Sequence, residues 1–218
     1  MLSNDSNRFY KLTFGTEFDS PEFYGQTAFG SEQLRAEGDE AVYQKWCSVS
    51  EKDNGIAVFN KGTYGGSVDK NVLGISLLRT PVYSAHPIND RPLADKDRTH
   101  DHIDIGEREF EYRITADTSN LDMQAECYNQ PCIALSFFPS GLGEKKNTSV
   151  ELDNSNIILT RLADTEKGTL VRLYNSTDNT ASVVLKIGGN EFSVDFTPFE
   201  VKTFVFADST FTETEMII

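Results

Sequence analysis

Residues 157–207 read IILTRLADTEKGTLVRLYNSTDNTASVVLKIGGNEFSVDFTPFEVKTFVFA, and this stretch decides the fold class. Its apolar residues occur in short runs, many of them alternating and rich in β-branched and aromatic types, such as TLVRLYN at 169–175 and EFSVDF at 191–196. Turn residues, among them Gly188-Gly189-Asn190, separate the runs. The block therefore predicts four regularly spaced strands in antiparallel sheets that pack face to face.

The same pattern extends toward the N-terminus. Comparable runs are GIAVFN at 55–60, VLGISLLR at 72–79, FEYRIT at 110–115 and IALSFF at 133–138. We therefore predict an all-β chain of antiparallel β-sandwiches. TSNLD at 118–122 breaks the strand pattern, so we expect one unit at 1–120 and a second at 121–218.

Two stretches do not read as core strands. Residues 31–45 carry many charges and are interrupted by Gly38, which predicts an exposed loop or an edge strand. Between Pro81 and Arg108 the chain is polar, with little periodicity of either kind. A loop of that length in a compact domain is either functional or disordered.

Composition narrows the class of function. The 218 residues carry 34 acidic and 20 basic side chains, a formal net charge of -14. The negative electrostatic potential of such a chain repels nucleic-acid backbones and anionic lipid surfaces, whereas it does not affect the binding of a neutral sugar. No apolar run approaches a membrane span and the N-terminus lacks a signal-peptide pattern. Three cysteines without zinc-ligand spacing, Cys47, Cys127 and Cys132, favour a reducing cytoplasm.

A series of motifs follows along the chain: Trp46, GIAVFN at 55–60, Tyr64-Gly65, LLRTP at 77–81, and Asp104-Ile105-Gly106 leading to Phe110 and Tyr112. In this order the motifs resemble the C-terminal β region of family 38 α-mannosidases. Further similar pieces are YNQP at 128–131, LVRLYN at 170–175 and PFEVKTF at 198–204. Arg108 departs from the pattern, because the family usually has a histidine shortly after the Asp-x-Gly motif.

The resemblance implies an organisation and a function. Residues 1–120 would be a portion of a large β-supersandwich, and 121–218 the smaller C-terminal sandwich. The intact enzyme would be a zinc-dependent retaining hydrolase of terminal α-mannosides. Its nucleophile, its acid/base and its zinc ligands would lie in an upstream catalytic domain, so this chain would hold no catalytic residue, no metal and no cofactor. The implied partners are that domain and mannose-containing glycans, and a homo-oligomer stays open.

Tyr64 and Arg79 are the candidate substrate-binding residues. The resemblance implies that the Leu-Leu-Arg segment lies near the catalytic cleft. An arginine offers fixed donors for sugar hydroxyls or a carboxylate, and a tyrosine offers a ring face and a hydroxyl. The structural alternative is that Arg79 pairs with an acidic residue at a strand end while Tyr64 caps a turn.

Other polar residues give weaker candidates. Retaining hydrolysis needs two carboxyl groups about 5–5.5 Å apart, and the pairs that we considered, Asp101 with Asp104 and Glu107 with Glu109, are expected to be solvated. The chain's histidines are His86, His100 and His102. Two of them belong to a cluster that could bind a divalent metal ion, made up of Asp97, His100, Asp101, His102 and Asp104, but polar loops often collect such residues without binding an ion.

Two further expectations concern Trp46 and the alternative functions. Trp46, which could stack on a sugar, is expected in the core, because it lies in a strand near Val42 and Val49. Two rival functions stay open: a stand-alone carbohydrate-binding module and a purely structural interaction domain. Fold alone does not separate them from a mannosidase region.

Overall fold

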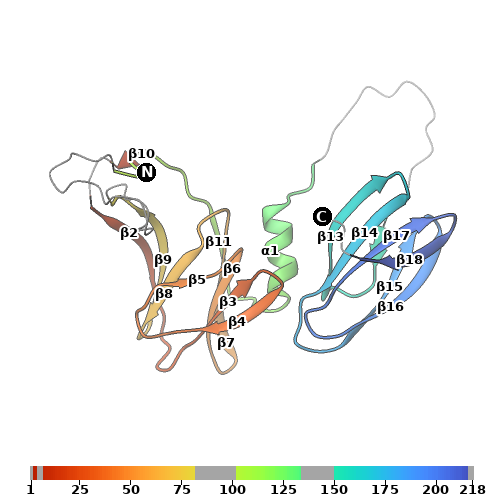
Figure 1. Cartoon of the computed structure of the whole chain (residues 1–218). Coiled ribbons are helices and arrows are strands. Elements are labelled where there is room, and N and C mark those ends of the chain that lie inside the picture. Colours follow the sequence, from red (N-terminus) through yellow and green to blue (C-terminus); the bar gives the residue numbers. More distant parts are fainter. Residues whose placement is uncertain (1, 4–6, 82–101, 134–149, 216–218) are drawn as a thin grey trace, which may run out of the picture. The chain divides into compact units, whose positions relative to one another are not determined.

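The computed structural model describes residues 2–3, 7–81, 102–133 and 150–215. The chain forms two compact units: the first unit is Met1–Gly25 with Gln33–Ala116, and the second unit is Gln26–Glu32 with Asp117–Ile218. Regular structure is almost entirely antiparallel strand, arranged in several open sheets (Figure 1). The prediction of an all-β fold of sandwiches is confirmed. The assignment of 1–120 and 121–218 to two family domains stays a prediction.

The first unit is built on two sheets. One has the order β2 (Phe9–Gly15), β9 (Val72–Arg79), β8 (Gly65–Asp69) and β5 (Ala41–Val42). The other has the order β11 (Tyr112–Thr115), β7 (Asn54–Asn60), β6 (Trp46–Glu51), β3 (Glu22–Thr27) and β4 (Gly30–Leu34). Residues 26–27 of β3 and 30–32 of β4 are counted with the second unit. A short pair, β1 (Leu2–Ser3) with β10 (Gly106–Glu107), completes the set.

Side chains from both sheets form the core of the first unit. The buried members are Phe23, Tyr43, Cys47, Val49, Val58, Val68, Leu73 and Ile75. Trp46 is only 4% exposed, which confirms its expected place in the core. Packing is tight at Gly25, where a Cβ atom would lie 2.6 Å from the Cβ of Tyr43, so that only glycine fits.

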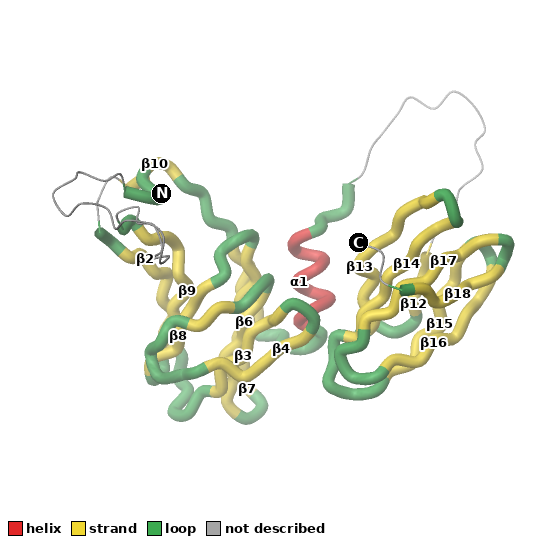
Figure 2. Tube along the Cα trace, viewed as in Figure 1, coloured by secondary structure: helices red, strands yellow, loops and turns green. Residues whose placement is uncertain are grey.

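The second unit also has two sheets (Figure 2). One has the order β12 (Val150–Leu152), β15 (Ala181–Ile187) and β16 (Asn190–Phe196). The other has the order β13 (Ile157–Thr165), β14 (Gly168–Asn175), β17 (Val201–Ala207) and β18 (Thr210–Thr214). Their inner faces meet in a core centred on residues such as Leu173, Leu185 and Phe196.

The expected count of strands in 157–207 was wrong, because the block holds five and not four. Ile187 pairs with Asn190, so only Gly188 and Gly189 connect β15 to β16. Both glycines have positive φ, 56° and 78°, which is the backbone of the tightest hairpin turns. Because this turn needs only two residues, β15 and β16 together fit into residues 181–196, so a prediction from regular spacing counted too few strands.

The helix α1 (Leu121–Asn129) was not predicted. It begins where the strand pattern was expected to break, and Asn120 before it has a positive φ of 46°. A helix of nine residues is marginal by itself, so tertiary contacts must hold it. Within the second unit, Ala125 is fully buried and the buried carboxyl of Asp122 accepts a hydrogen bond of 2.6 Å from the side chain of Gln26.

The remaining expectations concern edges and loops. The stretch 31–45 contains β4 and β5, which are the last strands of their sheets, so its interpretation as edge strand is confirmed. The strand expected at 133–138 lies outside the described residues except for Ile133, and most of the polar stretch 81–108 lies outside them too. No helix in the described part of the chain is long and apolar enough to span a membrane.

Candidate functional site

Tyr64 and Arg79 line the same open cleft in the first unit. Its volume is about 440 Å³, and Phe9, Glu40 and Ser76 also line it. The side chains of Tyr64 and Arg79 are both about half exposed, at 56% and 55%. The two residues predicted from sequence are therefore brought together and can be reached by a ligand, although contact with a substrate stays a prediction.

Strand register places these residues at one end of a sheet. Arg79 is the last residue of β9 and pairs with Phe9, the first residue of β2. Tyr64 directly precedes β8, whose first residue, Gly65, pairs with Val42 at the end of β5. The hydroxyl of the buried Tyr43 donates to the carbonyl of Gly65 at 3.1 Å, which fixes the turn beside Tyr64.

Glu40 is the electrostatic centre of the cleft. Lys11 forms an ion pair with one of its oxygens, while Ser76 donates to the other at 2.5 Å and the guanidinium of Arg79 lies 3.5 Å from it. Partial burial acts to raise the pKa of Glu40, but the hydrogen bonds and positive charges of these neighbours outweigh burial and lower the pKa below its usual value. Glu40 is therefore a charged anchor and not an acid that could donate a proton at neutral pH.

Arg79 is held by two different contacts. Besides Glu40, its guanidinium carbon lies 4.3 Å from the centre of the Phe9 ring. Stacking on an aromatic face orients the planar guanidinium and leaves donors at its edge for another group. The structural alternative for Arg79, an acidic partner at a strand end, is thus observed, and it leaves the side chain able to bind a hydroxyl or an anion.

The structure gives less support to the carboxylate pairs and to the possible metal site. Asp104 lies 3.9 Å from Arg108 as an exposed pair, and Glu107 and Glu109 are exposed, as solvated carboxylates would be. His102 contacts the carbonyl of Thr80 at 2.9 Å through Nδ1. The remaining members of the two candidate sets, Asp97, His100 and Asp101, lie outside the described residues, as does His86. The expected absence of a metal site stays a prediction.

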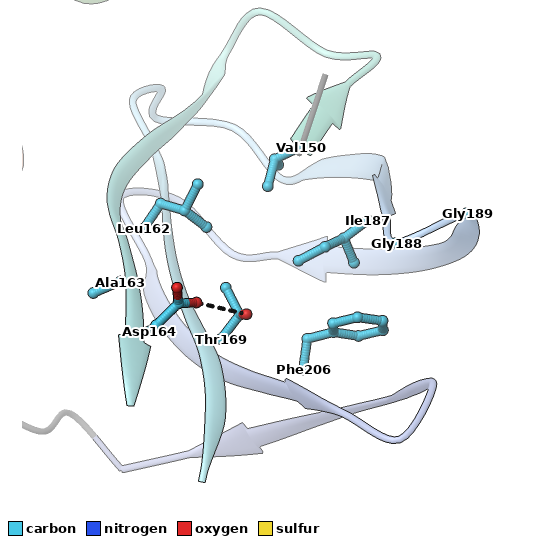
Figure 3. A pocket seen from close by; sticks show the side chains of 9 residues that line it. All are labelled: Val150, Leu162, Ala163, Asp164, Thr169, Ile187, Gly188, Gly189 and Phe206. Carbon is cyan, nitrogen blue, oxygen red and sulfur yellow. Dashed lines mark hydrogen bonds between the residues drawn. The ribbon is translucent and has the colours of Figure 1, made fainter. Parts of the chain in front are cut away.

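A second cavity lies in the second unit, lined by residues of both sheets (Figure 3). Its volume is about 540 Å³, and its walls are mostly apolar, with Val150, Leu162, Ile187 and Phe206. Its described polar side chains are Asp164 and Thr169, and the carboxylate of Asp164 accepts a hydrogen bond of 3.0 Å from the hydroxyl of Thr169. None of the described residues that line it is a candidate site residue from the sequence, so the cleft of Tyr64 and Arg79 is the candidate site.

The part of the chain that holds this cleft is similar to known proteins. Residues 4–95 match the glycosyl hydrolases family 38 C-terminal domain. The mouse (Mus musculus) protein alpha-mannosidase 2C1 is 35% identical over an alignment of 86 residues, and the match covers 36% of this chain and 8% of that protein. Tyr64 and Arg79 both lie inside the family 38 match.

Solved structures extend the similarity in fold beyond residues 4–95. An alpha-mannosidase from Enterococcus faecalis V583 shares the fold with a TM-score of 0.69 and 14% identity, covering 90% of this chain and 25% of that one. A glycosyl hydrolase family 38 protein from Enterococcus faecalis gives a TM-score of 0.71 and 15% identity, covering 90% and 26%. The chain therefore spans about a quarter of the length of these relatives.

Proposed function

We propose that this chain is the non-catalytic C-terminal region of a zinc-dependent retaining α-mannosidase, and that it supports the catalytic region and forms one wall of the sugar site. The observation that carries the proposal is the cleft of Tyr64 and Arg79, both within the residues that match the family 38 C-terminal domain. The names of the relatives, alpha-mannosidase 2C1 and an alpha-mannosidase of Enterococcus faecalis, agree with this activity.

The role of the cleft is to position a sugar and not to make or break bonds. Arg79 is oriented by the Phe9 ring and Glu40, so its outer donors point from a fixed base toward incoming hydroxyls. The exposed ring of Tyr64 offers an apolar face beside them. Glycoside hydrolysis also needs a protonated acid, and the charged Glu40, with its lowered pKa, cannot serve as one.

We assign the zinc to the catalytic region. Among the described residues, no three side chains of His, Cys, Asp or Glu come together in a way that could hold a metal ion. The described part of this chain therefore does not fit a zinc site. When bound in the catalytic region, zinc would supply Lewis acidity toward sugar hydroxyls.

The proposed setting is the cytoplasm, with the catalytic region and a mannose-containing glycan as partners. All three cysteines, Cys47, Cys127 and Cys132, are free thiols, as expected in a reducing compartment. Oligomer formation is part of the same proposal, and size-exclusion chromatography with light scattering of the chain, with and without the catalytic region, tests it.

Complementation tests the proposed function. The chain, a family 38 catalytic region from the same source, and the two together are each assayed for release of 4-nitrophenol from 4-nitrophenyl α-mannoside. We expect no release from the chain alone and a large gain in activity or heat stability when both are present. Equal activity and stability of the catalytic region with and without the chain would contradict a supporting role.

The exposed Tyr64 beside Arg79 also favours one rival, an independent carbohydrate-binding module. Titration of methyl α-mannoside onto the chain alone separates the two functions. A module should bind with a Kd of about 1 mM or better, whereas one wall of a site should bind far more weakly without its partner. Tight binding to the chain alone would favour the module.

A further inference from the structure

Another pocket, which shares lining residues with the candidate cleft, has positively charged side chains among its described residues. Its volume is about 440 Å³, and the described residues that line it are Asn7, Arg8, Phe9, Arg79 and Pro81. Two of these five residues are arginines and none is acidic. In a chain with a net charge of -14, such a local concentration of positive charge calls for an explanation.

The backbone below this pocket is firmly held. The amide of Asn7 donates to the carbonyl of Thr80 at 2.7 Å, and the amide of Thr80 donates to the carbonyl of Arg8 at 2.8 Å. The amide of Arg8 also donates to the hydroxyl of Thr80 at 2.9 Å, and Thr80 is fully buried. The backbone of Arg8 is therefore held rigidly next to the end of β9. A rigid backbone lowers the entropic cost of binding a ligand there.

The two arginines differ in how far their charge is already neutralised. Arg79 shares Glu40 with Lys11, which is the closer partner of that carboxylate. Arg8 has no acidic partner within salt-bridge distance among the residues that the structure describes. Counting only the described residues, the charge of Arg8 is thus uncompensated and that of Arg79 only partly compensated.

We propose that this pocket binds an anionic substituent, a phosphate or a carboxylate, on the glycoside whose sugar occupies the neighbouring cleft. Phe9 and Arg79 line both the pocket and the cleft, so a single ligand can occupy both. Guanidinium groups match the planar geometry of carboxylate and phosphate oxygens through paired hydrogen bonds. This inference rests on the proposed function and specifies its substrate class as anionic α-mannosides.

The test uses the whole chain and four soluble probes at low ionic strength: inorganic phosphate, mannose 6-phosphate, glucuronate and mannose. Binding is followed by amide chemical shifts. We expect at least one anionic sugar to bind about tenfold more tightly than mannose, the effect of one charge-assisted hydrogen bond. Raising sodium chloride from about 20 mM to about 200 mM should weaken anion binding and leave mannose unaffected.

A matched pair of variants localises the effect. Arg8→Gln should remove the preference for anions, while Arg35→Gln should keep it, because Arg35 is 80% exposed and lies outside the pocket. Comparable binding of anionic and neutral sugars by the wild-type chain would overturn the proposal. So would unchanged anion binding in a folded Arg8→Gln chain. Mannosidase complementation is measured separately, so the failure of this inference and the failure of the proposed function can be told apart.

The probes also separate the two sources of negative charge. Tighter binding of mannose 6-phosphate than of glucuronate, with inorganic phosphate as a competitor, would assign the pocket to phosphate. The reverse order would assign it to carboxylate. In both cases the shift changes should centre on the amides of Arg8, Phe9 and Thr80, and changes confined to the second unit would contradict this location.

Discussion

Replacing Glu40 by glutamine should destabilise the first unit by removing the charge that holds the candidate cleft together. The carboxylate pairs with Lys11, accepts a hydrogen bond of 2.5 Å from Ser76 and lies 3.5 Å from Arg79. Glutamine keeps the size of the side chain and one carbonyl acceptor but loses both ion pairs. The ammonium of Lys11, with a side chain only 25% exposed, then lacks its anionic partner.

The expected loss lies between the values for surface and buried pairs. Exposed ion pairs contribute about 0–1 kcal/mol, and breaking a buried pair costs about 3–5 kcal/mol. The side chain of Glu40 is 27% exposed, so an intermediate loss of about 2 kcal/mol is expected. For a unit of this size that lowers the melting temperature by about 10 °C.

Trp46 provides the assay for this prediction. It is the only tryptophan of the chain and is buried in the first unit, so its fluorescence reports the unfolding of that unit. Asp39→Asn is the matched control, because it removes the same charge one residue away. Asp39 is 67% exposed and lies 4.0 Å from Arg35, so its loss should cost less than about 0.5 kcal/mol.

The effect should also depend on pH in a defined direction. The pKa of Glu40 is lowered in the folded state, so its stabilising contribution is complete above the ordinary value of 4.5. It is lost as the pH falls through the lowered pKa, and the gap between the wild type and Glu40→Gln should then close. A Glu40→Gln melting temperature equal to that of Asp39→Asn, or a gap that persists in strong acid, would refute this reasoning.

Two further predictions concern the interior of each unit. Burial raises the pKa of the Cys47 thiol to about 12, so Ellman's reagent should label only the other two thiols in the native protein and all three after unfolding. Gly168→Ala should destabilise the second unit by at least about 2 kcal/mol, because its φ is +126° and a Cβ atom would lie 2.4 Å from the carbonyl oxygen of Phe206.

Each of these has its own check. Rapid labelling of Cys47 at neutral pH would show that the first core opens more readily than its packing implies. For the glycine, the control is Gly189→Ala, where φ is +78° but no atom lies within 4 Å of the added carbon. Circular dichroism during urea unfolding should give a loss of only about 1 kcal/mol there. Equal losses at the two sites would contradict the steric argument.

Strands were predictable from the sequence because burial on one face leaves an alternating pattern. The runs at 55–60 and 72–79 became β7 and β9 almost residue for residue. The helix α1 left no such signal, because it is short and depends on contacts such as that between Gln26 and Asp122, far apart in the chain. Local patterns do not carry interactions of that range.

Part of the candidate site could likewise be predicted from the sequence and part could not. Tyr64 and Arg79 were found through motifs, and strand register then explains why they share a cleft. Glu40 was missed, because it lies in a charged stretch like many others and gains its role only when Lys11 and Ser76 are brought to it by neighbouring strands. Arg8 was missed for the same reason.

The most direct test of the account is the effect of Arg79→Ala on hydrolysis by this chain joined to its catalytic region. The substrate is 4-nitrophenyl α-mannoside, and Arg35→Ala is the control. If Arg79 positions the sugar, kcat/KM should fall at least about tenfold, the effect of one hydrogen bond to a charged group, with the fold intact by circular dichroism. Unchanged kcat/KM, or mannoside cleavage by this chain alone, would contradict the account.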